Sequence, residues 1–275
     1  ASPNYIVVSA ATPNDSLYPD GSWSSTVTNE VSNWGQKYIK APAAWDITTG
    51  SVNTKIGVID RDFADEHIDI INNIAHVEQV GPDDGSTGYH GSHVAGIICG
   101  QGNNRFGIAG INWRCSLSTF SLGTNGSAAD VEYLMTRAVD NDVKIVNLSL
   151  SGSNVCAPAG GLTAAQRKSS DDFYARGMRY ATLNKKDVLW VFAAGNNCAD
   201  SKDISPTELV KTFPDNMITG GAINQDGTKR ADSNYGENVT VGAPGDRILS
   251  TYCWPTFGRK CLAGNYVESG ATSAA

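Results

Sequence analysis

The sequence lacks the features that mark several large classes of protein. Its longest apolar run, residues 188–195, is far shorter than the roughly 18 residues of a membrane-spanning helix. No basic segment followed by an apolar stretch opens the chain, so the protein is either cytosolic or has lost its signal. Lysine and arginine form no cluster and the net charge is −7, which gives nucleic-acid binding little support. No glycine-rich phosphate loop follows the first predicted strand, which argues against a nucleotide-binding α/β protein.

The composition is that of a globular protein. Hydrophobic residues make up 40% and charged residues 18% of the 275 positions, which argues against intrinsic disorder. A chain of this length buries about three quarters of its unfolded surface, so it needs no cross-links merely to fold.

Six cysteines are present without any CxxC pair, which argues against a zinc site. Their even number suits disulfides, and Cys253 and Cys261 are the first expected pair because they lie close in the sequence. Six free buried thiols are the alternative. Disulfides would indicate an oxidising compartment, and hence a secreted, extracellular or periplasmic protein.

Strand and helix patterns alternate along most of the chain. Residues 1–33 are rich in turn formers and predict irregular structure. Apolar segments typical of strands occupy residues 55–60, 118–122, 143–150, 187–194, 217–222 and 239–241. Helical patterns occupy residues 90–100, 128–141 and 164–184. This alternation predicts an α/β fold of three layers, with a mainly parallel central sheet covered by helices on both faces. Ligands of such sheets bind beyond the carboxyl ends of the strands.

Four polar residues occupy places where such a fold carries chemistry. Asp60 ends the first predicted strand, and His90 begins a predicted helix, whose positive end disfavours an imidazolium. Asn196 follows the most apolar strand, where its amide can donate to a developing oxyanion. Ser273 lies among small residues that suit a tight turn. Taken singly, three of them have ordinary alternatives: a cap or turn for Asp60, a capping or core histidine or half of a metal-binding pair for His90, and a turn residue for Asn196. The segment around Ser273 is a weak signal by itself.

In this order, and with the segments around them, the four residues resemble the subtilisin-like serine protease family, the subtilases. The resemblance runs from about Pro13 to Ala275, and the histidine helix is its most specific part. The supporting segments are residues 14–18, 39–45, 56–60, 90–96, 147–150, 193–196, 233–236 and 243–245.

The resemblance implies a secreted serine endopeptidase. Ser273 would attack the peptide carbonyl, His90 would act as general base and Asp60 would orient the imidazole. Asn196 would stabilise the oxyanion. The peptide or protein substrate would lie as a strand between two segments. These are Ser149, Leu150 and Ser151 on one side, and Asn125, Gly126 and Ser127 on the other.

The resemblance also implies a structural calcium ion and two more disulfides. Calcium would be held by the side chains of Asp69, Asn104 and Glu30 and by the carbonyls of Phe106 and Ile108. A hydrogen-bonded loop without metal is the alternative. The implied disulfides are Cys99–Cys115 and Cys156–Cys198, and the implied cis-proline turn is Phe213–Pro214.

The sequence departs from the family pattern at several points. Arg61 stands where a small hydroxyl residue is usual after the aspartate, and Ala271 stands where glycine is usual. Residues 1–11 resemble the end of an inhibitory propeptide, which leaves residues 12–275 as the catalytic domain. The family continues beyond the nucleophile with a further segment, expected as a partner of this chain. These departures support the alternative function, a catalytically impaired relative that binds peptides or proteins.

Overall fold

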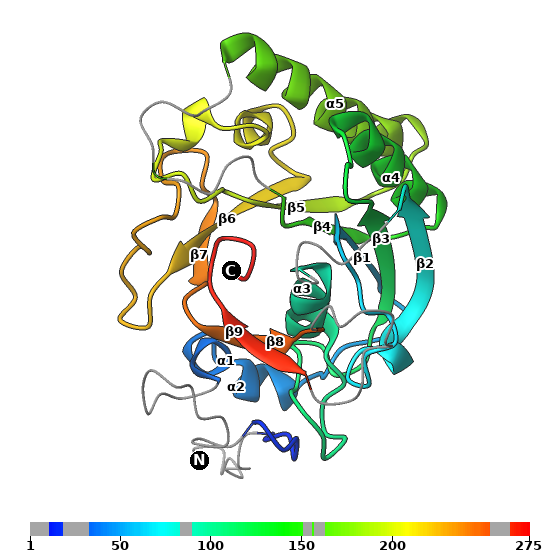
Figure 1. Ribbon diagram of the computed structural model, residues 1–275, viewed down its shortest axis with the longest axis vertical. Coiled ribbons are helices and arrows are strands. Elements are labelled where there is room, and N and C mark those ends of the chain that lie inside the picture. Colours follow the sequence, from blue (N-terminus) through cyan, green and yellow to red (C-terminus); the bar gives the residue numbers. More distant parts are fainter. Residues whose placement is uncertain (1–10, 19–32, 83–89, 151–155, 157–162, 254–264) are drawn as a thin grey trace, which may run out of the picture.

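A parallel sheet of seven strands forms the centre of the protein (Figure 1), with the strand order β2–β3–β1–β4–β5–β6–β7. The computed structural model describes residues 11–18, 33–82, 90–150, 156, 163–253 and 265–275. All six strand pairings of this sheet are parallel, as predicted. The strands are β1 (Lys55–Arg61), β2 (Ile74–Val80), β3 (Ser116–Leu122), β4 (Ile145–Leu148), β5 (Leu189–Ala193), β6 (Met217–Ile223) and β7 (Val241–Pro244). A separate antiparallel pair joins β8 (Ile248–Thr251) to β9 (Tyr266–Ser269).

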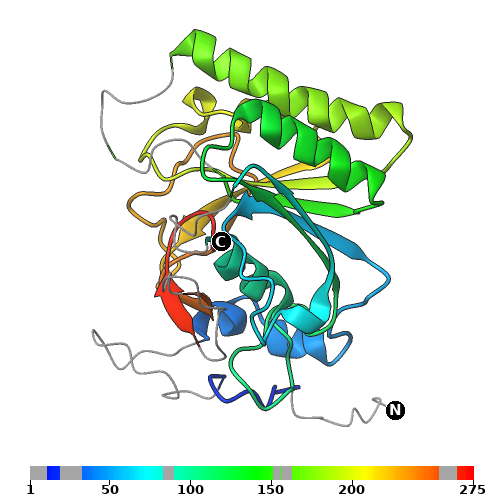
Figure 2. The same cartoon turned by 45° about the vertical axis from the view of Figure 1, so that its right-hand side comes forward.

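Helices cover both faces of the sheet, which confirms the three-layer α/β fold. Figure 2 shows α4 (Ala128–Asp140) and α5 (Ala164–Leu183) together on one side and α3 (His90–Cys99) on the other. Adjacent strand residues accordingly enter different cores, because side chains alternate along a strand. Ile59 packs in the core beneath α4 and α5, whereas Val58 packs in the core beneath α3. The short helices α1 (Trp34–Tyr38) and α2 (Ala41–Trp45) lie near β8 and β9 in Figure 1.

Local sequence explains why α4 and α5 form and pack as a pair. Each begins with a capping box, made by Ser127 with Asp130 and by Thr163 with Gln166. The two helices approach closely at Gly177, because a side chain there would meet Met135 at 2.8 Å. No helix in the described part of the chain is long and apolar enough to cross a membrane.

Strand β1 lies at the point of the sheet where the order of adding strands switches from one side to the other. After β1, the chain adds β2 and β3 on one side and then continues with β4 on the other. The carboxyl ends of β1, β4 and β5 therefore lie at one edge, where parallel sheets bind ligands. Asp60 and Arg61 end β1, and Asn196 follows β5 by three residues.

Some elements differ from the sequence-based prediction. Strand β7 begins at Val241, two residues after the expected start, and β2, β8, β9, α1 and α2 were not predicted. Among the described residues the cis peptide bond precedes Pro206, so the cis-proline expected at Phe213–Pro214 is wrong.

Candidate active site

The aspartate at the end of β1 and the histidine at the start of α3 are directly hydrogen-bonded. His90 Nδ1 donates to Asp60 Oδ1 over 2.7 Å, and the backbone N–H of Arg61 donates to the same oxygen, also over 2.7 Å. The side chain of Asp60 is 1% exposed and that of His90 is 38% exposed. Because the carboxylate accepts from Nδ1, His90 Nε2 remains an acceptor that is open to a ligand.

The charge of Asp60 governs the protonation of His90. Asp60 raises the pKa of His90 above its ordinary value, against the opposing effect of burial, and Asp62 adds to the rise. The carboxylate thus outweighs the helix terminus, which we expected to disfavour the imidazolium. The imidazole is consequently a stronger base than one held only at a helix start.

The loop after β5 holds Asn196 against the segment that carries the serine. Asn196 Oδ1 accepts from the backbone N–H of Thr272 over 2.8 Å, and Thr272 Oγ1 accepts from the N–H of Gly195 over 3.1 Å. The carbonyl of Ser273 accepts from the hydroxyl of Ser149 over 3.0 Å. These bonds connect the carboxyl ends of β4 and β5 to the turn that carries Ser273.

Asn234 fixes that loop in place, a role that the sequence alone does not predict. Its Oδ1 accepts from the N–H groups of Asn197 and Ala199, and its Nδ2 donates to the carbonyl of Ala194 over 2.8 Å. The side chain is 1% exposed. Asn234 lies in the segment 233–236 that carries the family resemblance, and this is the sequence signal that points to it.

One hollow of about 580 Å³ brings the predicted residues together. It is lined by both members of the Asp60–His90 pair, by Asn196 and by Ser273. In the described part of the chain, no hydrogen bond joins Ser273 to His90. Apolar side chains also line the hollow, among them Leu122, Val131, Leu150 and Tyr174.

The predicted substrate segments border this hollow. Gly126, Ser127, Ser149 and Leu150 line it, whereas Asn125 is exposed and not among the lining residues. Ser127 also caps α4, so it has a structural role as well. Ser151 lies outside the described residues.

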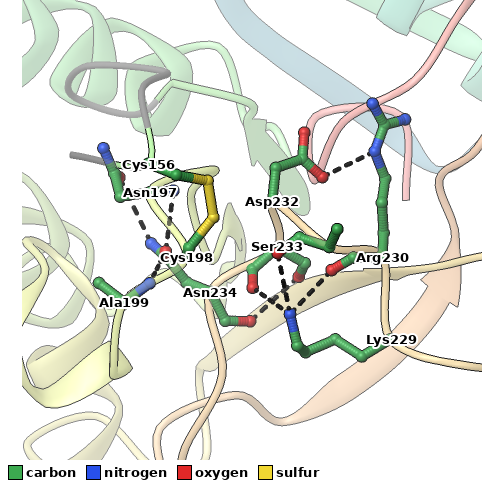
Figure 3. The surroundings of a disulfide bond; sticks show 10 residues. Cys156, Asn197, Cys198, Ala199, Lys229, Arg230, Asp232, Ser233 and Asn234 are labelled. Carbon is green, nitrogen blue, oxygen red and sulfur yellow. Dashed lines mark hydrogen bonds and ion pairs between the residues drawn. A yellow bond between two sulfur atoms is a disulfide. The ribbon is translucent and has the colours of Figure 1, made fainter.

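Two of the predicted disulfides are present. Cys99–Cys115 joins the end of α3 to the residue before β3, and Cys156–Cys198 joins the segment after β4 to the loop that carries Asn196. Figure 3 shows the second disulfide beside Asn234 and its contacts. It therefore ties the two sides of the hollow together. The remaining predicted pair includes Cys261, which lies outside the described residues.

Two buried histidines attach the β8–β9 pair to the rest of the domain. His93 Nε2 donates to the carbonyl of Ile248 over 3.1 Å, and His67 Nε2 donates to that of Asn265 over 3.0 Å. Burial lowers the pKa of His93 to about 4 and also lowers the pKa of His67. Both imidazoles are therefore neutral at pH 7 and structural. They support β9, which leads directly to the turn of Ser273.

The candidate calcium ligands meet in a network of hydrogen bonds. Asp69 accepts from Asn104 Nδ2 over 3.1 Å and from the N–H of Ile108 over 2.8 Å. The hydroxyl of Tyr266 also donates to Asp69, over 2.7 Å. Among the described residues there is no cluster of three or more His, Cys, Asp or Glu side chains that could hold a metal ion. Glu30 lies outside the described residues.

A second carboxylate, which we did not predict, adjoins this network. Asp15 accepts from the N–H of Asn103 over 2.6 Å and from that of Asn104 over 3.4 Å. Asp15 and Asp69 are both 0% exposed. Burial raises the pKa of Asp15 to about 6 and raises that of Asp69, and their mutual repulsion adds to the rise at Asp15. Neither carboxylate pairs with a lysine or arginine in the described chain.

Comparison with known proteins identifies similar sequences. A model of the subtilase family matches residues 51–275. The thermophilic serine proteinase of Bacillus sp. (strain AK1) is 31% identical over 258 residues, which are 91% of this chain and 56% of the relative. Thermitase of Thermoactinomyces vulgaris is 31% identical over 231 residues, 82% of this chain and 74% of the relative. Halolysin of Haloferax mediterranei is 31% identical, and the match spans 41% of its length. The chain thus spans about half the length of the Bacillus proteinase and of halolysin.

Solved structures share the fold. A protease of Pseudoalteromonas arctica has a TM-score of 0.71 at 21% identity, over 96% of this chain and 84% of its own. A cold-adapted subtilisin-like serine proteinase has a TM-score of 0.59 at 21% identity, over 80% and 70% of the two chains.

Proposed function

The chain belongs to the subtilase family, and on that premise we propose that it is a serine endopeptidase that hydrolyses peptide bonds with Ser273 as nucleophile. The observation that carries this proposal is the single hollow in which the hydrogen-bonded pair of Asp60 and His90 meets Asn196 and Ser273.

In the proposed mechanism the proton acceptor is His90 Nε2, the ring nitrogen that is not bonded to Asp60. Ser273 Oγ attacks the substrate carbonyl while His90 Nε2 takes the hydroxyl proton. Asp60 holds the imidazole in the required tautomer and stabilises the imidazolium. His90 then returns the proton to the leaving amine, and the resulting acyl-enzyme is hydrolysed by water through the same steps.

The proposed oxyanion site comprises the side-chain amide of Asn196 and the backbone N–H of Ser273. The Oδ1 of Asn196 is held by the N–H of Thr272, which leaves the Nδ2 group to donate. Loss of such a donor lowers turnover by about 10²–10³-fold, the magnitude known from subtilisin.

The substrate would bind as an extended strand between the segments 125–127 and 149–151. Backbone hydrogen bonds would supply most of the affinity. The two disulfides among the described residues suit an oxidising compartment, so we propose that the protein is secreted. We also propose that processing near residues 10–12 separates a propeptide remnant from the catalytic domain, 12–275; residues 1–10 lie outside the described chain.

A fluorophosphonate probe tests the proposed nucleophile. We expect intact mass spectrometry to show one adduct per molecule, and peptide mapping to locate it on Ser273. The reaction should cease when the protein is denatured first, because an isolated serine hydroxyl is unreactive. Absence of any adduct on the folded protein would instead favour the catalytically impaired, peptide-binding relative.

We further propose that Asp15, Asp69 and Asn104 hold a structural calcium ion together with backbone carbonyls of the loop 103–108. All the proposed ligand atoms are oxygens, which suits Ca²⁺. Burial raises the pKa of both carboxylates, and repulsion from Asp69 adds to the rise at Asp15. A bound cation would offset both effects and fix the loop beside β9.

Calcium is therefore expected to stabilise the chelator-treated protein. At a calcium concentration 100-fold above Kd the gain is about 2.7 kcal/mol, or an increase in Tm of roughly 5–10 °C. The pKa of Asp15 is 3.8 in the unfolded chain and about 6 in the folded protein. Without calcium, the free energy of unfolding therefore falls as the pH rises from 3.8 through about 6. The calcium-dependent gain should accordingly grow over this interval, since calcium binds the carboxylate.

The variant Asp15→Asn should lose most of the calcium-dependent gain in Tm, measured by thermal unfolding at several calcium concentrations. Asp215→Asn, which alters an exposed carboxylate, is the matched control and should retain it. An equal calcium response in the two variants would exclude Asp15 as a ligand.

A further inference from the structure

Arg61 follows the aspartate of the active site and places a cation at the hollow. Arg61 is among the residues that line the hollow, together with His90 and Ser273. It is the only lysine or arginine among the described lining residues, most of which are small, polar or apolar.

The guanidinium is only weakly engaged by the rest of the protein. Its one side-chain hydrogen bond runs from Nη2 to the carbonyl of Gly126 and is 3.5 Å long. In the described part of the chain, no Asp or Glu carboxylate lies within ion-pair distance of it. The nearby carboxylates of Asp60 and Asp62 are each 1% exposed. Because a guanidinium has five N–H donors, most of the donors of Arg61 remain available to a ligand.

We propose that Arg61 is a specificity-determining residue that selects substrates with an aspartate or glutamate just before the scissile bond. This inference rests on the proposed function, in which the substrate strand runs along the segment 125–127. Arg61 reaches Gly126 of that segment and follows Asp60, the partner of His90. The acidic side chain therefore belongs to the first or the second substrate residue on the amino-terminal side of the cleaved bond.

A carboxylate suits this position for two reasons. It can accept two parallel hydrogen bonds from a guanidinium, a charge-assisted contact stronger than one between neutral groups. The half-buried side chain of Arg61 is also less screened by salt than a fully exposed cation. Substrates with lysine in the same place would meet repulsion.

Matched fluorogenic peptides that differ only by Glu, Gln or Lys at each of the two positions test the proposal. For the unaltered protein we expect kcat/KM to be about 10-fold higher with Glu than with Gln at one position. The ratio should fall to about 1 in Arg61→Gln, and Arg61→Glu should favour Lys. High salt should weaken the preference of the unaltered protein. Arg114→Gln removes an exposed arginine away from the hollow and should keep the preference.

Ratios within one variant do not depend on how much of it is folded. Binding of the same peptides to Ser273→Ala, measured by fluorescence anisotropy, gives a second test that needs no catalysis. If all the peptides are hydrolysed and kcat/KM is about the same for Glu and Gln at both positions, the inference is overturned and the proposed function stays intact. Absence of hydrolysis combined with preferential binding of the Glu peptide would overturn the proposed function and support the role of Arg61. Equal binding of Glu and Gln peptides would overturn the inference in either case.

Discussion

Replacement of Ser273 by alanine is expected to lower kcat by about 10⁶-fold, the magnitude known for the corresponding change in subtilisin. The serine lies in the hollow with His90, and the turn that carries it is bonded to the loops after β4 and β5. Removing its Oγ removes the attacking atom and leaves only the oxyanion donors and substrate binding. Those account for a residual rate about 10³–10⁴-fold above that of water.

The same residues should act as one unit. His90→Ala is expected to cost about as much as Ser273→Ala, and the double variant should be no slower than either single variant. Steady-state kinetics on one peptide substrate, with active protein quantified by folding assays, provides the measurement. Independent, multiplicative losses would show that the two residues do not cooperate in one step.

Loss of fold must be distinguished from loss of chemistry. Ser51→Ala changes an exposed serine far from the hollow and should retain full activity. Ser273→Ala should unfold at nearly the same temperature as the unaltered protein, because the substitution removes only a hydroxyl group that makes no hydrogen bond in the described chain.

Much of the fold could be predicted because its signals are local. The helix 128–140 has apolar residues at helical spacing, and the strand 55–61 is an apolar run that ends in a polar residue. The rule that parallel sheets bind ligands at their carboxyl ends then placed Asp60 and Asn196 at one edge. His90 and Ser273 required the family resemblance, because His90 begins the helix α3 and Ser273 follows β9 of the separate antiparallel pair, so this rule places neither of them.

The strands and the site residue that the sequence does not predict depend on contacts between distant segments. Strand β8 pairs with β9 across the segment 252–265, and nothing in either short run indicates its partner. Asp15 approaches Asp69 and the loop 103–108 only in the folded chain. Strand β2 alternates between half-buried and exposed positions at the edge of the sheet, so it lacks the continuous apolar run of the buried strands.

The pair of Asp60 and His90 leads to the second large prediction. Asp60→Asn is expected to lower kcat by about 10⁴-fold, a loss known for this change in a serine protease triad. An asparagine can present its own N–H₂ group to Nδ1, which would favour the tautomer with the proton on Nε2. The imidazole would then be unable to accept the proton of Ser273, although all the surrounding contacts remain.

The pH dependence separates this electrostatic role from a merely structural one. His90 must be neutral to act as base, so kcat/KM rises with pH through the pKa of His90 in the free enzyme. Asp60 raises that pKa, and its charge is absent in Asp60→Asn. The acidic limb of the profile should therefore move to lower pH in the variant, even though the rate is lower at every pH.

The pH dependence of the free energy of unfolding gives an independent check on the Asp60–His90 interaction. Because the folded state raises the pKa of His90, the pair stabilises the fold fully below the unfolded pKa of about 6.5, and this contribution is lost as pH rises through the folded value. Asp60→Asn should thus lose more stability at pH 5 than at pH 9, measured by urea unfolding. A variant with an unchanged kinetic pH profile and a pH-independent loss of stability would indicate that Asp60 only fills space beside His90. The 2.7 Å bond between Asp60 and His90 and the burial of the carboxylate predict the opposite result.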